Sequence, residues 1–139
     1  MLIKPGSIAF VCALGFVMAL AAPACQSKPG TAAGNDNAAQ AIYAYLQARV
    51  DGDANRIVAL SCSKWEPQAR IEVASFKAVK PRLEEVSCKT AGTDGETTLV
   101  TCLGKIVTSY NGERRDFDVS HRQYVAVNDG GEWRMCGYR

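Results

Sequence analysis

Six cysteines constrain the fold of this 139-residue chain more than any other feature of its sequence. Four of them follow residue 60 and stand singly, without the Cys-x-x-Cys spacing typical of zinc sites. In an oxidising compartment, four cysteines form two disulfides, and three pairings are possible. We therefore expect a small domain held by two disulfides, which are formed by Cys62, Cys88, Cys102 and Cys136. We expect neither a zinc site nor another metal centre.

Residues 1–24 have the pattern of a secretory signal peptide. Lys4 lies in a short positive segment, an uncharged apolar stretch runs from Ile8 to Ala22, and small residues continue to Ala24. A membrane-spanning helix needs roughly 20 apolar residues, so this stretch is short for one. We expect a cleaved signal peptide, with a retained membrane anchor as the alternative.

Cys25 directly follows the expected cleavage site, and this position resembles the bacterial lipobox, in which a lipid-modified cysteine becomes the first residue of the mature protein. Ala24-Cys25 matches the end of that motif, whereas the family usually has Leu where this chain has Ala22, and Pro23 is uncommon at its position. Ordinary signal peptidase would also accept Ala22-Pro23-Ala24. Cys12 leaves with the signal, so lipidation of Cys25 leaves four cysteines for two bridges. Residues 25–36 are therefore interpreted as a lipidated cysteine and a flexible tether.

Helix signals fill the first half of the remaining chain. Asn37 and Gln40 suit the start of a helix over about 38–50, whose apolar stripe includes Arg49. Asp53 can cap a short helix over about 54–61. A capping box at 63–66 predicts a third helix that continues to about Val79 and buries Trp65, Ala69, Val73 and Phe76.

Strand signals fill the second half, because the apolar period changes from 3.6 to 2 after Pro81. The expected strands are about 83–90, 97–110, 115–127 and 132–138, separated by turn clusters at 92–95, 111–112 and 128–131. Asn111-Gly112 is the most specific of these turns, since a two-residue type I′ hairpin needs positive φ at both positions. The sequence predicts an α+β domain with three N-terminal helices packed on one face of a four-stranded antiparallel meander.

The strand pattern selects one disulfide pairing. If the first hairpin is centred on Gly95, Cys88 and Cys102 lie opposite each other, seven residues away on either side. Opposed residues of a non-hydrogen-bonded pair are close enough for a bridge. Cys62 then pairs with Cys136 and joins the helical half to the last strand.

The helix order and the strings around the cysteines, such as Val100-Thr-Cys102 and Trp133-Arg-Met-Cys136-Gly, resemble bacterial lipoproteins with a nuclear transport factor 2-like domain, here over residues 37–139. The resemblance implies a curved sheet wrapped around helices, often with a pocket at its wide end. Members include ketosteroid isomerase-like and cyclase-like enzymes as well as non-enzymatic binding domains, so the resemblance implies an architecture and leaves the activity open.

His121, the single histidine, is the candidate for chemistry. In the third expected strand it shares a face with Phe117, Val119, Gln123 and Val125, and we expect this face to lie under the helices. An inward histidine that no carboxylate orients is more often structural than a general base. The enzymatic alternative assigns His121 as the base of an isomerase-like or cyclase-like reaction.

The charge balance argues against nucleic acid as a partner. The chain carries a net charge of +2, and removal of the signal with Lys4 lowers it to +1, so no broad basic face is available. No other catalytic or cofactor motif occurs, and we expect no cofactor. The preferred interpretation is a non-enzymatic lipoprotein on the extracytoplasmic side of the cell membrane or envelope, which binds a small apolar ligand or an envelope protein.

Overall fold

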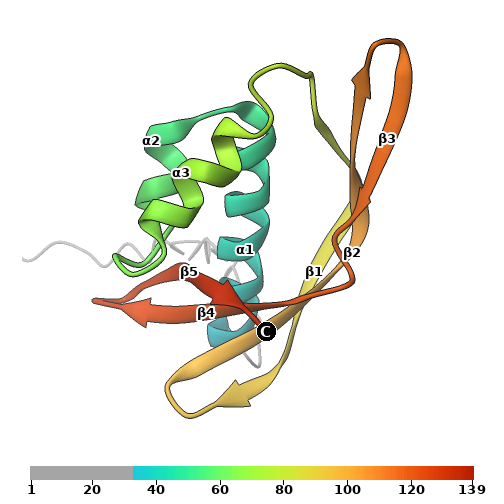
Figure 1. The fold of residues 1–139 in the computed structure, drawn as a ribbon. Helices are drawn as coiled ribbons and strands as arrows, with labels where there is room; N and C mark the ends of the chain where they lie inside the picture. Colours follow the sequence, from blue (N-terminus) through green and yellow to red (C-terminus); the bar gives the residue numbers. More distant parts are fainter. Residues whose placement is uncertain (1–32) are drawn as a thin grey trace, which may run out of the picture.

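The computed structural model describes residues 33–139, with side chains from residue 37 onward. Within residues 33–139, three helices precede five strands. Helix α1 lies between the α2–α3 pair and the long β1–β2 ribbon, whereas the β2–β3 hairpin extends to one side (Figure 1). The α+β class with helices first is therefore confirmed. The elements are α1 (Ala33–Asp51), α2 (Ala54–Ala59), α3 (Glu66–Ala74), β1 (Arg82–Asp94), β2 (Thr97–Tyr110), β3 (Glu113–Asp118), β4 (Gln123–Asp129) and β5 (Glu132–Tyr138).

The signal peptide expected at 1–24 and the lipidated Cys25 lie outside the described residues. The expected tether, 25–36, enters the described part only at residues 33–36, which form the start of α1. Across residues 33–139, no helix combines the length and hydropathy needed to cross a membrane.

The helix boundaries follow local capping only in part. Asp53 caps α2 as expected, because its side chain accepts a hydrogen bond of 2.9 Å from the backbone N–H of Arg56. The capping box at 63–66 does not form. Helix α3 begins after Trp65 without a side-chain cap and ends at Ala74, several residues before the expected Val79. The turn that follows α3 still places Phe76 in the core.

The sheet has five strands rather than the expected four, in the order β1-β2-β4-β5, and β3 also pairs with β2. All of these pairs are antiparallel. Strand β2 is the central element, since its first half pairs with β4 and its second half with β3. The expected strand 115–127 is interrupted at residues 119–122, between β3 and β4.

This interruption changes which face of the strand meets the helices. Ile106 pairs with Phe117, whereas Val100 pairs with Tyr124, so the register along β2 shifts by one residue across the break. A one-residue shift reverses the side-chain alternation. Tyr124 and Ala126 are therefore the buried residues of β4, and the expected inward row through His121, Gln123 and Val125 is wrong.

Two of the hairpins follow the turn chemistry of their residues. Asn111 and Gly112 both have positive φ, at 51° and 80°, and join Tyr110 to its partner Glu113, as a type I′ turn requires. Gly130 and Gly131 make the equivalent turn between β4 and β5. The first hairpin differs from the expectation, because Asp94 pairs with Thr97 and the loop is therefore Gly95-Glu96.

Two disulfides join the pairs that the sequence analysis selected. A register shift between Thr90 and Gly92 brings Cys88 opposite Cys102, with a Cα–Cα distance of 4.0 Å. The other disulfide joins Cys62 to Cys136 over 74 positions of sequence, beside an isolated parallel bridge between Ser61 and Met135. This disulfide therefore ties the segment that follows α2 to β5. Disulfides of this kind indicate an oxidising, extracytoplasmic compartment.

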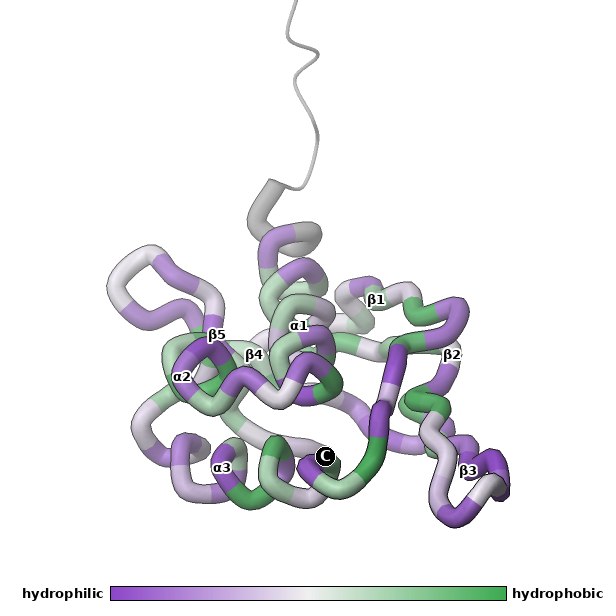
Figure 2. Tube along the Cα trace, turned by 90° about the horizontal axis from the view of Figure 1, so that it is seen from above, coloured by the Kyte–Doolittle hydropathy of each residue, from purple (hydrophilic) through white to green (hydrophobic). Residues whose placement is uncertain are grey.

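The core lies where α1 crosses the sheet. Ile42, Tyr45 and Leu46 of α1 have no exposed surface, and Val100 of β2 and Met135 of β5 are equally buried in the same cluster. These side chains recur at helical spacing on one face of α1, as the sequence predicted. In contrast, every residue of β3 is exposed, and the strand is mostly hydrophilic where it extends from the domain (Figure 2).

Candidate functional site

A pocket of about 300 Å³ opens where the end of α3 faces β3, β4 and β5. Its volume lies at the lower end of the range for small-molecule sites. The wall is mainly apolar and aromatic, and three charged side chains join it. The residues are Phe76, Ile106, Phe117, Val119, Tyr124 and Tyr138, with Ser75 and the charged Arg49, Asp118 and Arg122.

The aromatic walls of this pocket are in mutual contact. Phe76 and Phe117 meet edge to face with ring centroids 6.0 Å apart, and Tyr124 meets Tyr138 in the same way at 5.3 Å. Trp65 also meets Tyr138 edge to face, with the ring centroids 5.2 Å apart. Such pairs hold the rings in defined orientations. The pocket therefore has a preformed wall.

Behind Tyr138 lies a buried carboxylate, Glu72 of α3, which is 6% exposed. Tyr45 donates a hydrogen bond of 2.9 Å to one of its oxygens, and the Tyr138 hydroxyl lies 2.9 Å from both. Trp65 Nε1 in turn donates to the Tyr45 hydroxyl at 3.0 Å. Arg49 Nη1 lies 3.6 Å from Glu72 Oε2. Burial of a charge is tolerated when it is paired and hydrogen-bonded in this manner.

The tyrosine hydroxyls of this network are held in the protonated form. Burial, followed by the charge of Glu72, raises the pKa of both Tyr45 and Tyr138 well above the usual range. Burial likewise raises the pKa of Tyr124 to about 12. Neutral hydroxyls donate hydrogen bonds, so Tyr45 and Tyr138 are the donors to the side chain of Glu72.

Two guanidinium groups face the same pocket, each over an aromatic ring. The Arg49 guanidinium lies 5.0 Å from the centroid of Phe76, and that of Arg122 lies 4.7 Å from the centroid of Tyr138. Such stacking fixes the plane of a guanidinium while its edge remains available for hydrogen bonds. Arg49 Nε is buried without a hydrogen-bond partner among the described residues.

His121 lies outside this pocket. It occupies the segment between β3 and β4, its side chain is 79% exposed, and its Nε2 lies 3.7 Å from a carboxylate oxygen of Asp118. The expectation of an inward, core-facing histidine is therefore wrong, and the physical reason is the one-residue register shift at 119–122. The enzymatic alternative assumed an enclosed imidazole, whereas the structure places the His121 side chain at the surface.

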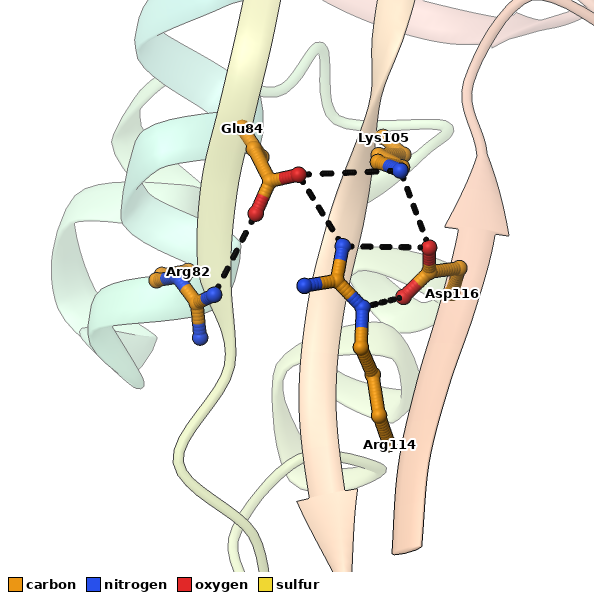
Figure 3. Close-up of polar contacts among 5 residues, drawn as sticks. All are labelled: Arg82, Glu84, Lys105, Arg114 and Asp116. Carbon is orange, nitrogen blue, oxygen red and sulfur yellow. Dashed lines mark hydrogen bonds and ion pairs between the residues drawn. The ribbon is translucent and has the colours of Figure 1, made fainter.

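A cluster of charged side chains lies on the face of the sheet that is turned away from the helices (Figure 3). Arg114 of β3 donates to Glu84 of β1 at 3.0 Å and to Asp116 at 2.8 Å, while Lys105 of β2 lies 3.0 Å from Asp116. Arg82 completes the cluster through Glu84 at 3.2 Å. Hydrogen bonds from Arg114 hold the pKa of both carboxyl groups below their usual values.

This surface cluster has a structural explanation. Val107 is 1% exposed although it lies on this outer face, and its register partners are Arg82 and Asp116. The aliphatic stems of long charged side chains commonly cover an apolar residue in this way. The cluster therefore joins three strands at the base of the β2–β3 hairpin.

Sequence reasoning missed two charged side chains on apolar stripes, one in the pocket wall and one in the network behind it. Arg49 follows Tyr45 by four positions on the buried face of α1, and Glu72 lies between Ala69 and Phe76 at helical spacing. A charged residue at a buried position of a stripe is a usable signal, because burial of a charge needs a partner. Over residues 33–139, no group of three His, Cys, Asp or Glu side chains is arranged to hold a metal ion.

Comparison with known proteins identifies the fold. No protein family matches the sequence, and no curated protein does. Among solved structures, a nuclear transport factor 2-like protein with a cystatin-like fold from Novosphingobium aromaticivorans is similar, with a TM-score of 0.51 and 13% identity. The match covers 72% of this chain and 75% of the other. The likeness shows a nuclear transport factor 2-like fold for this chain, as the sequence resemblance implied.

Proposed function

We propose that this chain is an exported, lipid-anchored binding domain whose pocket between α3 and β3–β5 takes a small ligand with an apolar body. The observation that carries the proposal is the pocket of about 300 Å³, with four aromatic side chains in its wall. Apolar walls with a few convergent polar groups are typical of ligand sites. The nuclear transport factor 2-like fold supports this function, since many of its members are binding domains.

The volume of the pocket limits the size of the ligand. Water in the liquid occupies about 30 Å³ per molecule, so the pocket holds on the order of ten non-hydrogen atoms. A single aromatic ring with a short substituent, or an acyl chain of similar size, fits this limit. Polyaromatic compounds and steroids exceed it unless the wall moves.

The pocket is tested with a variant that fills its mouth. Ser75 is an exposed residue of the pocket wall, and Ser75→Trp places an indole there with the loss of one hydrogen bond, from the Ser75 hydroxyl to the backbone carbonyl of Glu72 at 2.7 Å. NMR shift perturbation by 2-phenylethanol should affect residues of the wall in the native chain and be lost in Ser75→Trp. The matched control Lys77→Trp, on the same exposed turn but outside the pocket, should bind as the native chain does. Equal binding by both variants, or perturbation centred elsewhere, would rule the pocket out.

The anchor is tested separately. Intact-mass analysis of the protein from a membrane fraction should show a mature chain that begins at Cys25 and carries lipid. Cys25→Ser should release a soluble form or block processing. An unmodified cysteine at the mature N-terminus would contradict lipidation and leave the pocket unaffected.

A further inference from the structure

We infer that the ligand of this pocket carries a single carboxylate, held by the guanidinium groups of Arg49 and Arg122; this inference rests on the proposed binding function. Both side chains belong to the pocket wall, Arg49 from α1 and Arg122 from the segment that precedes β4. They converge there from opposite ends of the sequence, and both act electrostatically on the same buried side chain, Tyr124.

Both arginines have N–H donors that no side chain among the described residues is shown to satisfy. A guanidinium has five N–H donors. Within residues 37–139, Arg49 is engaged only by the ion pair with Glu72 at 3.6 Å and by the ring of Phe76, and its Nε has no partner. Arg122 is engaged by the ring of Tyr138. The Arg49 side chain is 21% exposed, so water satisfies only part of its demand.

The stacking on aromatic rings orients both guanidinium groups. A guanidinium stacked on a ring presents its N–H groups in its own plane, at the edge, where a carboxylate accepts two parallel hydrogen bonds. Phe76 and Tyr138 are both wall residues of the pocket, so the stacking places the two guanidinium planes at its boundary. The apolar wall then receives the body of the ligand, and the arginines receive its anionic end.

Two acidic side chains near the arginines limit the negative charge that the ligand can carry. Asp118 also lies in the wall, and Glu72 lies directly behind it. Glu72 is occupied by the hydroxyls of Tyr45 and Tyr138, and Asp118 accepts a hydrogen bond of 2.7 Å from the backbone N–H of Ser120. These two acids oppose the charges of the two arginines. One further negative charge is therefore better accommodated than the two of a phosphate monoester.

The experiment compares three ligands of similar size by calorimetric titration of the purified full chain. Phenylacetate is the carboxylate probe, 2-phenylethanol is its neutral counterpart, and phenyl phosphate is the dianion. We expect phenylacetate to bind at least about tenfold more tightly than either of the others, which corresponds to about 1.4 kcal/mol. Its affinity should fall as salt concentration rises.

Arg122→Gln is the decisive variant, because Arg122 is exposed and, within residues 37–139, meets the Glu72 network through the ring of Tyr138 alone. It should weaken phenylacetate about ten times more than it weakens 2-phenylethanol, and Arg122→Lys should restore part of the loss. Arg70→Gln on the exposed face of α3 is the matched control and should bind as the native chain does. Equal affinities for phenylacetate and 2-phenylethanol, or tighter binding of phenyl phosphate, would overturn the carboxylate inference while the pocket stands. Failure of all three probes to bind would instead refute the proposed function.

Discussion

Replacement of Glu72 by glutamine removes the charge on which the buried network depends and keeps the shape of the side chain. The native carboxylate accepts hydrogen bonds from Tyr45 and Tyr138 at 2.9 Å and lies 3.6 Å from Arg49. A glutamine retains one acceptor oxygen and presents an amide N–H₂ in place of the other. One tyrosine therefore loses its acceptor or shares it, and Arg49 loses its ionic partner.

The size of the effect follows from the two tyrosine contacts. A hydrogen bond to a charged group contributes about 1.5–3 kcal/mol, and a neutral one contributes about 1 kcal/mol. Two weakened bonds and a guanidinium without its partner therefore give a loss of about 2–4 kcal/mol. Proteins have net stabilities of about 5–15 kcal/mol, so this is a large fraction. For a domain of this size each kcal/mol lowers Tm by about 4 °C, which gives a decrease of about 8–16 °C.

Urea unfolding monitored by circular dichroism measures the loss, and a double-mutant cycle tests its cause. Tyr138→Phe alone and combined with Glu72→Gln should give a coupling energy of about 1 kcal/mol or more. Glu96→Gln changes an exposed turn carboxylate for which the structure shows no pairing within residues 37–139, and this control should cost less than about 0.5 kcal/mol. A Glu72→Gln variant as stable as the control, or strictly additive with Tyr138→Phe, would refute the network as a source of stability.

Three further predictions follow from the packing. Gly104→Ala should lower the free energy of unfolding by about 2–4 kcal/mol, because its φ is 97° and a Cβ there would lie 2.5 Å from the backbone oxygen of Glu85. The control Gly112→Ala, with φ of 80° and open space around it, should lose only the conformational part, about 1 kcal/mol. Equal losses in the two variants would contradict the clash at Gly104. The free energy of unfolding should stay constant up to about pH 10 and fall above it, by up to about 1.4 kcal/mol per pH unit for each of Tyr45, Tyr124 and Tyr138. The reason is that their raised pKa keeps these tyrosines protonated in the folded state, whereas they ionise in the unfolded chain. In a variant with Tyr43→Phe and Tyr110→Phe, tyrosinate absorbance should accordingly appear only together with unfolding, and an earlier rise would contradict the burial argument. Removal of the Cys62–Cys136 disulfide by double substitution to alanine should cost about 4.5 kcal/mol, and removal of the Cys88–Cys102 disulfide about 3 kcal/mol, since the sequence separations are 74 and 14 residues. Thermal unfolding compares the two double variants, and the reverse order would contradict the loop-entropy account.

Local signals in the sequence predicted the local features of this fold. Asn111-Gly112 makes the predicted turn and Asp53 makes the predicted cap, since each depends on a few neighbouring atoms. The disulfide between Cys88 and Cys102 was predicted from a hairpin centred on Gly95. The actual hairpin has a two-residue loop, and a register shift between Thr90 and Gly92 restores the expected pair.

The features that sequence reasoning did not predict depend on distant parts of the chain. The register shift at 119–122 arises because β3 and β4 pair with different halves of β2, and the alternation of residues 115–127 alone contains no sign of it. The hydroxyl of Tyr138 reaches Glu72 across 66 positions of sequence. For the same reason His121 was assigned to the interior and Arg122 was not considered for the pocket.

The order of the cysteines along the chain has a consequence for biosynthesis. In sequence, the Cys88–Cys102 disulfide lies inside the loop closed by Cys62 and Cys136. When the chain is exported N-terminal end first, Cys62 therefore reaches the oxidising compartment well before its partner Cys136 does. Oxidation in order of appearance would join Cys62 to Cys88 and trap a non-native species. A β-hairpin forms in microseconds, whereas disulfides form in seconds or longer, so early pairing of β1 with β2 shields Cys88 and Cys102 from this error. Cells that make this protein in quantity therefore need either that hairpin to fold first or a thiol–disulfide isomerase to correct the mispaired chain.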